Sequence, residues 1–339
     1  MVDTHISERP RRTFFVGLNT GFVHDGAPDE RMVAFYEERS SALLSCAIIG
    51  NVVLPGGHPV NATTATMSSD RRWKTLATSI AAQGTTPGVQ LATAWENYEG
   101  ATSFRPKNWV ETIAKSRALA AWVSSSRLRQ LFEGLLAGTE MAAEAGFRHV
   151  QLHAAHGYLF SLLMDRRLYD GAAECLELAG AWSQTCRKAG LETSVRISLK
   201  TGDADFDRVG ATTHQDAACS LPVDIVDVSS GFYNIDKRLI YPSTRAILRD
   251  RHRETLELAA RHPGTQFILS GKASGVVDDL PPNVHLGFCR DLIANPKFLE
   301  GRSHGCQNSG KCHYHSRGAS SVWCPLWEPD SKAFRTASP

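Results

Sequence analysis

The stretch AGFRHVQLHAAHGYL, residues 145–159, joins the end of a helical segment to a short apolar run and then to a polar loop. Residues 148–153 alternate between polar and apolar side chains, and a period of two is typical of a β-strand. Gly146 follows an alanine-ended helical pattern and marks the end of that helix. The stretch therefore predicts a helix, a strand and a loop that begins at His153.

Short runs rich in Val, Ile and Phe recur along the chain and alternate with longer segments of helical composition. The predicted strands are residues 13–18, 46–53, 88–91, 148–153, 193–198, 224–228, 266–269 and 284–288. The clearest predicted helices are residues 29–44, 71–82, 128–145, 174–189 and 243–261. Eight alternating strands and helices, with a usual core of about 250 residues, predict an α/β protein with the (β/α)8 TIM barrel fold. A doubly wound sheet is the alternative, but no G-x-G-x-x-G motif follows a predicted strand.

Composition excludes several classes of protein. Lys plus Arg is 37 and Asp plus Glu is 35, a formal net charge of +2, so we expect no nucleic-acid partner. No segment reaches the about 20 apolar residues of a membrane helix, and MVDTHISERPRR lacks the apolar core of a signal peptide. We therefore expect a cytoplasmic protein without a membrane partner that acts on a small molecule, and a homo-oligomer stays open. We expect one domain over residues 1–339, with a cysteine-containing extension at about 301–339.

Reactive side chains of such a barrel belong where the strands run into loops at their C-terminal ends. Alternation along 148–153 points His153 into the mouth of the barrel, and His156 and Tyr158 follow within one turn. Two imidazoles can bind a carbonyl or phenolate oxygen, and a tyrosine can donate a proton. A capped loop with satisfied histidines is the alternative, but three polar groups at one mouth favour a site.

Two further positions suggest a charged or electron-rich ligand. Arg196 lies between apolar residues of a predicted strand, where a cation is costly unless it is paired. The partner is either a ligand inside the barrel or Asp227 on the next strand. Gly271 and Arg290 follow the last two strands, where barrels of this kind often hold a phosphate. An ordinary turn with a solvated arginine is the alternative there.

The order of these features resembles the old yellow enzyme family of FMN-dependent barrel oxidoreductases. The resemblance runs from about Phe14 to Leu299, and residues 145–159 are similar to the family's A-G-[FY]-x-x-[VI]-[EQ]-[IL]-H-x-A-[HN]-G-Y-L signature. Residues 195–198, Val-Arg-Ile-Ser, and residues 290–296, with Arg290, add two weaker matches. The resemblance implies FMN as the cofactor and NAD(P)H as the co-substrate.

The resemblance also implies roles for individual residues. Those that would contact FMN are Thr20, Gly50, Gln90 and Arg196 at the ring system and Ser270, Gly271 and Arg290 at the phosphate. His153 and His156 would orient the substrate oxygen and Tyr158 would donate a proton, as hydride passes to the activated C=C bond of an enone or quinone-like compound. A flavin-dependent oxidase, dehydrogenase or amine demethylase is one alternative. A barrel that binds a ligand without catalysis is the other.

Several positions depart from the family pattern. Gln90 is followed by Leu-Ala-Thr-Ala-Trp-Glu-Asn-Tyr rather than by His-x-Gly-Arg, and Cys289 replaces the glycine before the phosphate arginine. The unusual segment Trp95–Tyr98 and a shortened loop after Tyr158 predict a specialised substrate, whereas Cys289 weakens the match at the phosphate.

The C-terminal cysteines resemble the [4Fe–4S] segment of larger family members. Cys306, Cys312 and Cys324 match three cluster ligands, but Ser309 stands in place of the remaining one. Because a serine oxygen is a poor ligand for iron–sulfur clusters, we expect no cluster and no metal, with the thiols packed as ordinary side chains. The alternative is a Cys3His zinc site that uses His313 or His315.

Overall fold

The structure, a computed structural model, describes residues 10–96, 98, 109–273, 280–301 and 304–327. Eight parallel strands close into a barrel in the order β1-β10-β9-β8-β7-β6-β5-β4. The barrel strands are β1 (Thr13–Phe15), β4 (Cys46–Val53), β5 (Thr86–Ala92), β6 (His149–Ala154), β7 (Glu192–Ser198), β8 (Ile225–Ser229), β9 (Gln266–Ser270) and β10 (Val284–Phe288). The predicted (β/α)8 TIM barrel is confirmed.

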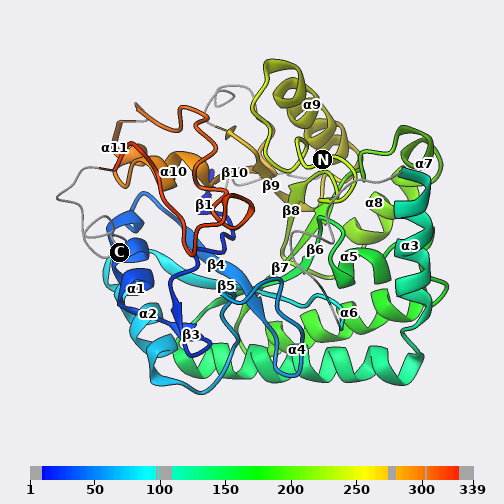
Figure 1. The fold of residues 1–339 in the computed structure, drawn as a ribbon, viewed down its shortest axis with the longest axis horizontal. Helices are drawn as coiled ribbons and strands as arrows, with labels where there is room; N and C mark the ends of the chain where they lie inside the picture. Colours follow the sequence, from blue (N-terminus) through cyan, green and yellow to red (C-terminus); the bar gives the residue numbers. More distant parts are fainter. Residues whose placement is uncertain (1–9, 97, 99–108, 274–279, 302–303, 328–339) are drawn as a thin grey trace, which may run out of the picture.

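Helices alternate with the strands and cover the barrel (Figure 1). They are α1 (Glu30–Arg39), α2 (Arg71–Ala82), α3 (Trp109–Ala121), α4 (Ser125–Ala145), α5 (Leu159–Leu163), α6 (Ala172–Lys188), α7 (Ala204–Arg208), α8 (Ala211–Cys219), α9 (Arg245–Arg261), α10 (Arg290–Ala294) and α11 (Phe298–Gly301). The apolar faces of α2, α4 and α6 pack against strands β5 and β7. Burial of these faces is the main stabilising contribution to the fold.

Local sequence signals account for where α4 begins and ends. The hydroxyl of Ser124 accepts a hydrogen bond from the backbone N–H of Arg127 at 3.2 Å, which caps the first turn. Gly146 ends the helix in the left-handed conformation, with φ of 103°, as predicted. The chain can then enter β6 directly, so this glycine sets the start of the strand that carries His153.

Two predicted elements are longer than the observed ones. The strand predicted at 13–18 ends at Phe15, because the chain turns toward Thr20 at the rim. The helix predicted at 29–44 ends at Arg39, where Ser40 adopts an extended backbone and its hydroxyl donates to the Tyr36 carbonyl at 2.7 Å. That bond satisfies a free carbonyl of the last turn, which lets the helix stop there.

The end of the barrel opposite the strand C-termini is closed by a partly buried polar network. Arg12 donates to both carboxylate oxygens of Glu192, and the ring of His149 bonds Glu192 at 2.7 Å and Ser194 at 2.7 Å. Burial alone would raise the pKa of Glu192, but the bonds from Arg12 and His149 hold that pKa well below its usual range. This network stabilises the closed barrel and lies away from the mouth.

The C-terminal segment 304–327 folds back onto the barrel beside α10 (Figure 1, orange and red). Its backbone N–H at Val322 donates to the Thr20 carbonyl at 2.7 Å, and the Trp327 indole donates to the Ile293 carbonyl at 2.6 Å. The segment thus forms part of the rim near β1 and α10.

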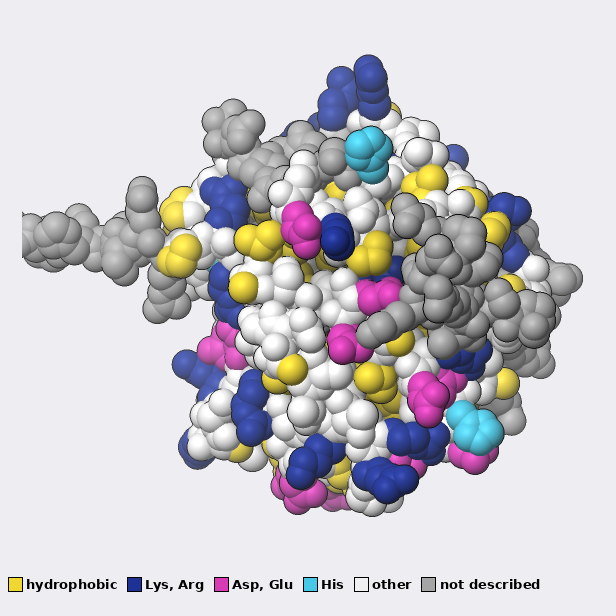
Figure 2. Space-filling view, turned by 90° about the vertical axis from the view of Figure 1, so that its left-hand side faces the viewer, with side chains coloured by type: hydrophobic (Ala, Val, Ile, Leu, Met, Phe, Trp, Pro, Cys, Tyr) yellow, Lys and Arg dark blue, Asp and Glu magenta, His cyan; other side chains and the backbone are white. Residues whose placement is uncertain are grey.

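Surface properties agree with the near-zero net charge. On the face shown in Figure 2, Lys and Arg side chains are interspersed with Asp and Glu. None of the helices in the described part of the chain combines the length and apolar character that a membrane crossing requires.

Candidate active site

Strand register brings the predicted polar residues side by side at the mouth of the barrel. Gln90 on β5 pairs with Gln151 on β6, and His153 on β6 pairs with Arg196 on β7. Arg196 in turn pairs with Asp227 on β8. Because side chains two residues apart share a face of a strand, all five point into the barrel. Parallel pairing therefore builds one continuous polar layer from four strands.

His153, His156 and Tyr158 converge above this layer, as the sequence predicts. The ring centroid of His153 lies 5.1 Å from that of His156 and 5.2 Å from that of Tyr158. All three side chains are buried. Gly157, with φ of 82°, makes the turn between them, and a Cβ there would lie 3.0 Å from the ring of Phe232. A glycine is required at this position for the two loops to approach each other.

Burial sets the protonation states of these groups. Burial, together with the nearby Arg196 cation, lowers the pKa of His153 to about 3. Burial, His153 and Arg196 also place the pKa of His156 well below its usual range. Burial raises the pKa of Tyr158 well above its usual range. At neutral pH the site therefore presents two uncharged imidazoles, each with one N–H donor and one acceptor nitrogen, and a protonated phenol with an O–H donor.

The two imidazoles differ in their partners. The Nε2 atom of His156 lies 2.7 Å from the hydroxyl of Ser229, which fixes the orientation of that ring. The Nδ1 atom of His153 is buried and has no hydrogen-bond partner in the structure. Because buried polar atoms are nearly always satisfied, this nitrogen marks a place for a ligand atom.

The sequence left the partner of Arg196 undecided, and in the structure that partner is Asp227. The Nη1 atom of Arg196 lies 2.6 Å from the Asp227 carboxylate, which also accepts from Ser270 at 2.6 Å and from Gln151 at 3.3 Å. The Nε atom of Arg196 is buried without a partner. Gln90 donates to Gln151 at 2.5 Å, so the amides and the ion pair form one network.

Three cations surround the ends of β9 and β10, and their hydrogen-bond acceptors are neutral. Arg290, the first residue of α10, donates to the Pro242 carbonyl and, at 3.3 Å, to the Asn308 side chain. Lys272 donates to the Cys306 carbonyl at 3.0 Å. Arg251 on α9 donates to the carbonyls of strand ends and a neighbouring loop. Carbonyl oxygens do not neutralise these charges, so this end of the mouth favours an anion.

The remaining predicted residues lie around the same mouth in different roles. Ser270 turns its hydroxyl toward Asp227, whereas Gly271 bends the chain with φ of 99°. Gly50 lies against Gln90, since a Cβ there would be 2.7 Å from the Gln90 Cβ. The buried Thr20 accepts a hydrogen bond from the Phe22 N–H at 3.2 Å and lies under the C-terminal segment. Thr20 is therefore on the rim, not in the His–Tyr group.

Sequence reasoning missed three phenols and one arginine of the site. Tyr98, Tyr233 and Tyr241 gather beside Tyr158, and nothing in their sequence spacing indicates it. Arg251 had a detectable signal, because helical periodicity places it on the same buried face as Thr255 and Leu258. Arginine is rarely buried unless its charge is paired, so a buried arginine on the apolar face of a helix is a candidate site residue.

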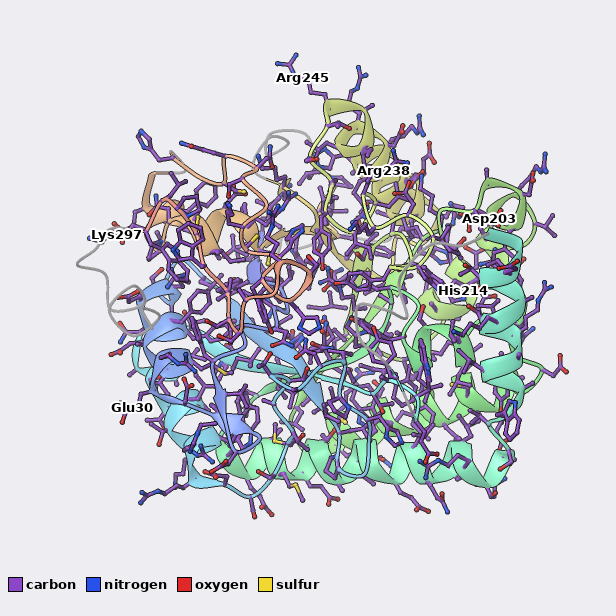
Figure 3. All side chains as sticks on the ribbon, in the orientation of Figure 1. Glu30, Asp203, His214, Arg238, Arg245 and Lys297 are labelled. Atoms are coloured by element: carbon purple, nitrogen blue, oxygen red, sulfur yellow. The ribbon has the colours of Figure 1, made fainter. Side chains whose placement is uncertain are left out.

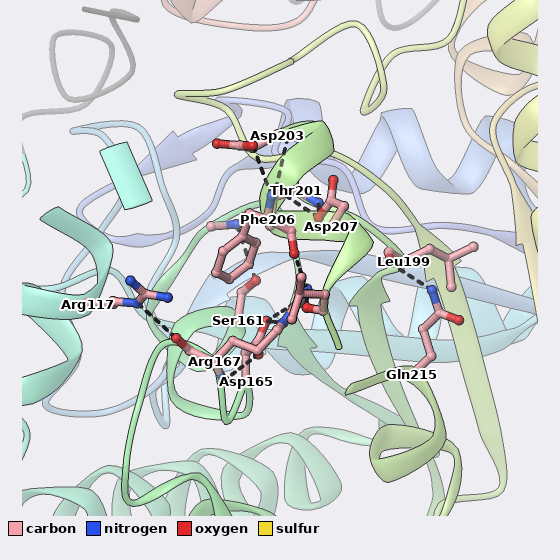
Figure 4. A network of polar contacts seen from close by, with 12 residues as sticks. Arg117, Ser161, Asp165, Arg167, Leu199, Thr201, Asp203, Phe206, Asp207 and Gln215 are labelled. Carbon is pink, nitrogen blue, oxygen red and sulfur yellow. Dashed lines mark hydrogen bonds and ion pairs between the residues drawn. The ribbon is translucent and has the colours of Figure 1, made fainter. Parts of the chain in front are cut away.

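A polar network beside the mouth fixes the loops that carry the site (Figure 4). Arg167 pairs with Asp165 at 2.7 Å in the loop after β6, and it also donates to the Phe206 and Val209 carbonyls after β7. Asp207 accepts from the backbone N–H of Thr201 at 2.8 Å. These bonds tie the loop after β6 to the loop after β7.

The cysteines of the C-terminal segment are free thiols in the structure. Cys306 accepts a hydrogen bond from the Asn308 N–H, and its own N–H donates to Asp291 at 2.8 Å. Across the described residues, no group of three or more His, Cys, Asp or Glu side chains is arranged to hold a metal ion.

The fold and these residues define a (β/α)8 barrel protein with a polar site at the C-terminal ends of its strands. No protein-family model matches the sequence. The chain is similar to an NADPH dehydrogenase of Bacillus velezensis, 23% identical over 236 residues, which is 66% of this chain and 68% of that protein. It is also similar to an NADH-dependent flavin oxidoreductase of Aspergillus parasiticus, 22% identical over 313 residues, which is 80% of this chain and 68% of that protein.

A solved structure shares the fold. The complex of 2-naphthoyl-CoA reductase with 2-naphthoyl-CoA matches with a TM-score of 0.69 at 13% identity, over 95% of this chain. The chain spans 56% of the length of that protein. This likeness shows the fold alone, and the two relatives, at low identity, are a nicotinamide-dependent dehydrogenase and a nicotinamide-dependent flavin oxidoreductase.

Proposed function

We propose that this protein is an FMN-dependent oxidoreductase that moves hydride from NAD(P)H to the activated C=C bond of an enone or quinone-like compound. The observation that carries the proposal is the convergence of His153, His156 and Tyr158 at the mouth, with the Nδ1 atom of His153 unpartnered. The names of the two relatives support a flavin and a nicotinamide co-substrate.

The residues at the mouth fit a flavin. The buried Nε atom of Arg196 has no hydrogen-bond partner among the described residues, and a carbonyl edge of a flavin ring would supply the missing acceptor. Gln90, Gly50 and Thr20 would border the same ring from β5, β4 and the rim. Arg196 is already paired with Asp227 at 2.6 Å, so its Nε atom would contribute a hydrogen bond rather than a full unpaired charge.

The phosphate of the cofactor would lie at the ends of β9 and β10. Among the described residues, the hydrogen bonds that Arg290 and Lys272 donate there go to neutral oxygens. The hydroxyl of Ser270 is engaged by Asp227, so Ser270 and Gly271 would contribute their backbone rather than a side chain. Arg251, behind this loop, adds a third positive charge.

Bound FMN would supply the hydride carrier between NAD(P)H and the alkene. The protein's own residues would handle the oxygen and the proton. His153 and His156, both uncharged, would donate hydrogen bonds to the substrate oxygen as negative charge develops on it, and a single donor of this kind is worth about 10²–10³ in rate. Tyr158 would then give its phenolic proton to the α-carbon.

An isotope experiment tests the proposal. FMN-loaded protein is supplied without oxygen with 2-cyclohexenone and NADPH that carries deuterium at the transferable position, and the saturated ketone is analysed by mass spectrometry. We expect deuterium at the β-carbon from the nicotinamide, and deuterium at the α-carbon when the solvent is D2O. Failure to bind FMN, or no saturated product with either nicotinamide, contradicts the proposal.

A further inference from the structure

Four tyrosines line one side of the mouth and form a chain of phenols. The Tyr158 ring centroid lies 6.2 Å from that of Tyr98 and 5.6 Å from that of Tyr233, and Tyr158 shares a side-chain hydrogen bond with Tyr233. The Tyr233 hydroxyl is in turn hydrogen-bonded to the Tyr241 hydroxyl. The result is a continuous path of O–H groups from Tyr158 through Tyr233 to Tyr241.

The path leads from Tyr158, the most buried of these three tyrosines, toward the C-terminal segment. Tyr158 is only 7% exposed, whereas Tyr233 and Tyr241 are half-buried. The Tyr241 ring stacks on the ring of His313, with 3.9 Å between centroids, and His313 is itself half-buried in the C-terminal segment. Tyr241 is therefore the member of the chain that meets the rim.

The backbone holds Tyr233 firmly in this path. The Tyr233 N–H donates to the His156 carbonyl at 3.2 Å, and a β-bridge joins His156 to Phe232. Gly157 leaves the space that Phe232 fills, which brings the loop after β8 against the loop after β6. The position of Tyr233 beside Tyr158 is thus built into both loops.

We propose that Tyr233 and Tyr241 relay a solvent proton to Tyr158 after Tyr158 has protonated the substrate; this inference rests on the proposed function. The substrate gains one hydride and the proton of Tyr158. The resulting phenolate takes the proton of Tyr233, Tyr233 takes that of Tyr241, and Tyr241 takes one from water at the rim. Each phenol ends as it began, and the net change is one solvent proton delivered to the α-carbon.

The neighbouring histidines are poorly suited to this task. His153 and His156 are the other titratable groups beside Tyr158, but burial keeps their pKa values far below neutrality, His153 at about 3. An imidazole that resists protonation does not carry a proton inward at neutral pH. A phenolate left in this buried place is costly, so rapid reprotonation by hydrogen-bonded phenols is favoured.

Comparison of the first turnover with later ones tests the relay. The variants are Tyr241→Phe and Tyr233→Phe in FMN-loaded protein, with 2-cyclohexenone as the oxidant and NADPH as the reductant. Tyr169→Phe is the matched control, because Tyr169 is another buried tyrosine whose hydroxyl donates to a carbonyl, that of Val123 at 2.7 Å. The first turnover uses the proton already on Tyr158, whereas every later turnover needs a new one.

We expect both relay variants to show a burst of one turnover followed by steady turnover about 10²-fold slower, the lower end of the usual contribution of proton transfer by a positioned side chain. Addition of a small acid such as imidazolium should restore the later turnovers of Tyr241→Phe, and the control should behave as the wild type. A merely structural role would slow the first and later turnovers together, and that result overturns the relay, as does absence of rescue.

A second readout needs neither cofactor nor substrate. In protein labelled with ¹³Cζ-tyrosine, the Tyr158 signal should shift in Tyr233→Phe and not in Tyr169→Phe, because only the former removes its phenol neighbour. An unmoved Tyr158 signal overturns the relay. A wild-type protein that reduces no alkene overturns the proposed function and the relay with it, whereas wild-type turnover without a burst in the variants overturns the relay alone.

Discussion

Arg196 and Asp227 form an ion pair of 2.6 Å across neighbouring strands inside the barrel, and Asp227 is fully buried. The carboxylate also accepts bonds from Ser270 and Gln151, so it joins strands β6, β7, β8 and β9. A buried pair of this kind contributes little net stability when intact, but removal of one partner leaves a charge uncompensated. The pair therefore fixes the position of the Arg196 guanidinium but adds little to the stability of the fold.

Asp227→Asn should lower the free energy of unfolding by about 3–5 kcal/mol, because the Arg196 guanidinium then stays buried without its counter-ion. Urea denaturation followed by circular dichroism measures this loss. The control is Asp205→Asn, which breaks an exposed pair with Arg208 whose side chains are 89% and 74% exposed, and which should not change stability measurably. Equal stability of the two variants would contradict the account of the pair.

Acid should destabilise the protein over a defined range of pH. The folded-state pKa of His153 is about 3, below the ordinary value of 6.5, so the unfolded chain binds this proton more readily. The contribution of His153 to stability is therefore complete above pH 6.5 and is lost as the pH falls toward about 3. Glu192 also loses its contribution to stability as the pH falls, but only below the ordinary glutamate pKa of 4.5.

Between pH 4.5 and pH 6.5, the ordinary pKa values of glutamate and histidine, the contribution of His153 to stability changes while that of Glu192 does not. We expect the thermal midpoint of His153→Asn to fall less steeply than that of the wild type as the pH drops from 6.5 to 4.5. Because His153 also helps to lower the pKa of His156, the difference in slope reports on His153 together with its effect on His156. Parallel slopes would show that His153 is not held neutral by the fold.

Local patterns in the sequence account for the barrel and for part of the site. Alternation along β6 places His153 at the mouth, and Gly146 fixes where that strand starts. Tyr233 and Tyr241 were missed because their approach to Tyr158 depends on how two loops fit around Gly157, which no local pattern expresses. The partner of Arg196 stayed open for a related reason, since a ligand and Asp227 satisfy the same sequence signal.

Arg290→Gln should weaken FMN binding about 10- to 100-fold, the factor that corresponds to loss of one charged hydrogen bond of about 1.5–3 kcal/mol. Quenching of flavin fluorescence on titration of the apoprotein measures the dissociation constant. Arg245→Gln is the control, because Arg245 at the start of α9 extends away from the barrel (Figure 3). Equal weakening in both variants would point to general charge attraction rather than to a phosphate site.

Tyr158→Phe should separate the two half-reactions. Oxidation of the reduced flavin by 2-cyclohexenone is expected to slow by about 10²–10⁴, the usual contribution of a general acid. Reduction by NADPH uses no proton from Tyr158 and should slow far less. Stopped-flow absorbance of the flavin measures both rates in one preparation, and an equal loss in both would rule out the proton-donor role.

The central claim is that the barrel mouth holds FMN and passes hydride to an activated alkene, and a visible absorption experiment tests it most directly. The apoprotein is titrated with FMN, then NADPH is added without oxygen, and 2-cyclohexenone follows. The account predicts one FMN bound per chain, loss of the yellow absorbance with NADPH, and its full return with an equal amount of saturated ketone. A protein that stays colourless, or a flavin that the enone does not reoxidise, would contradict it.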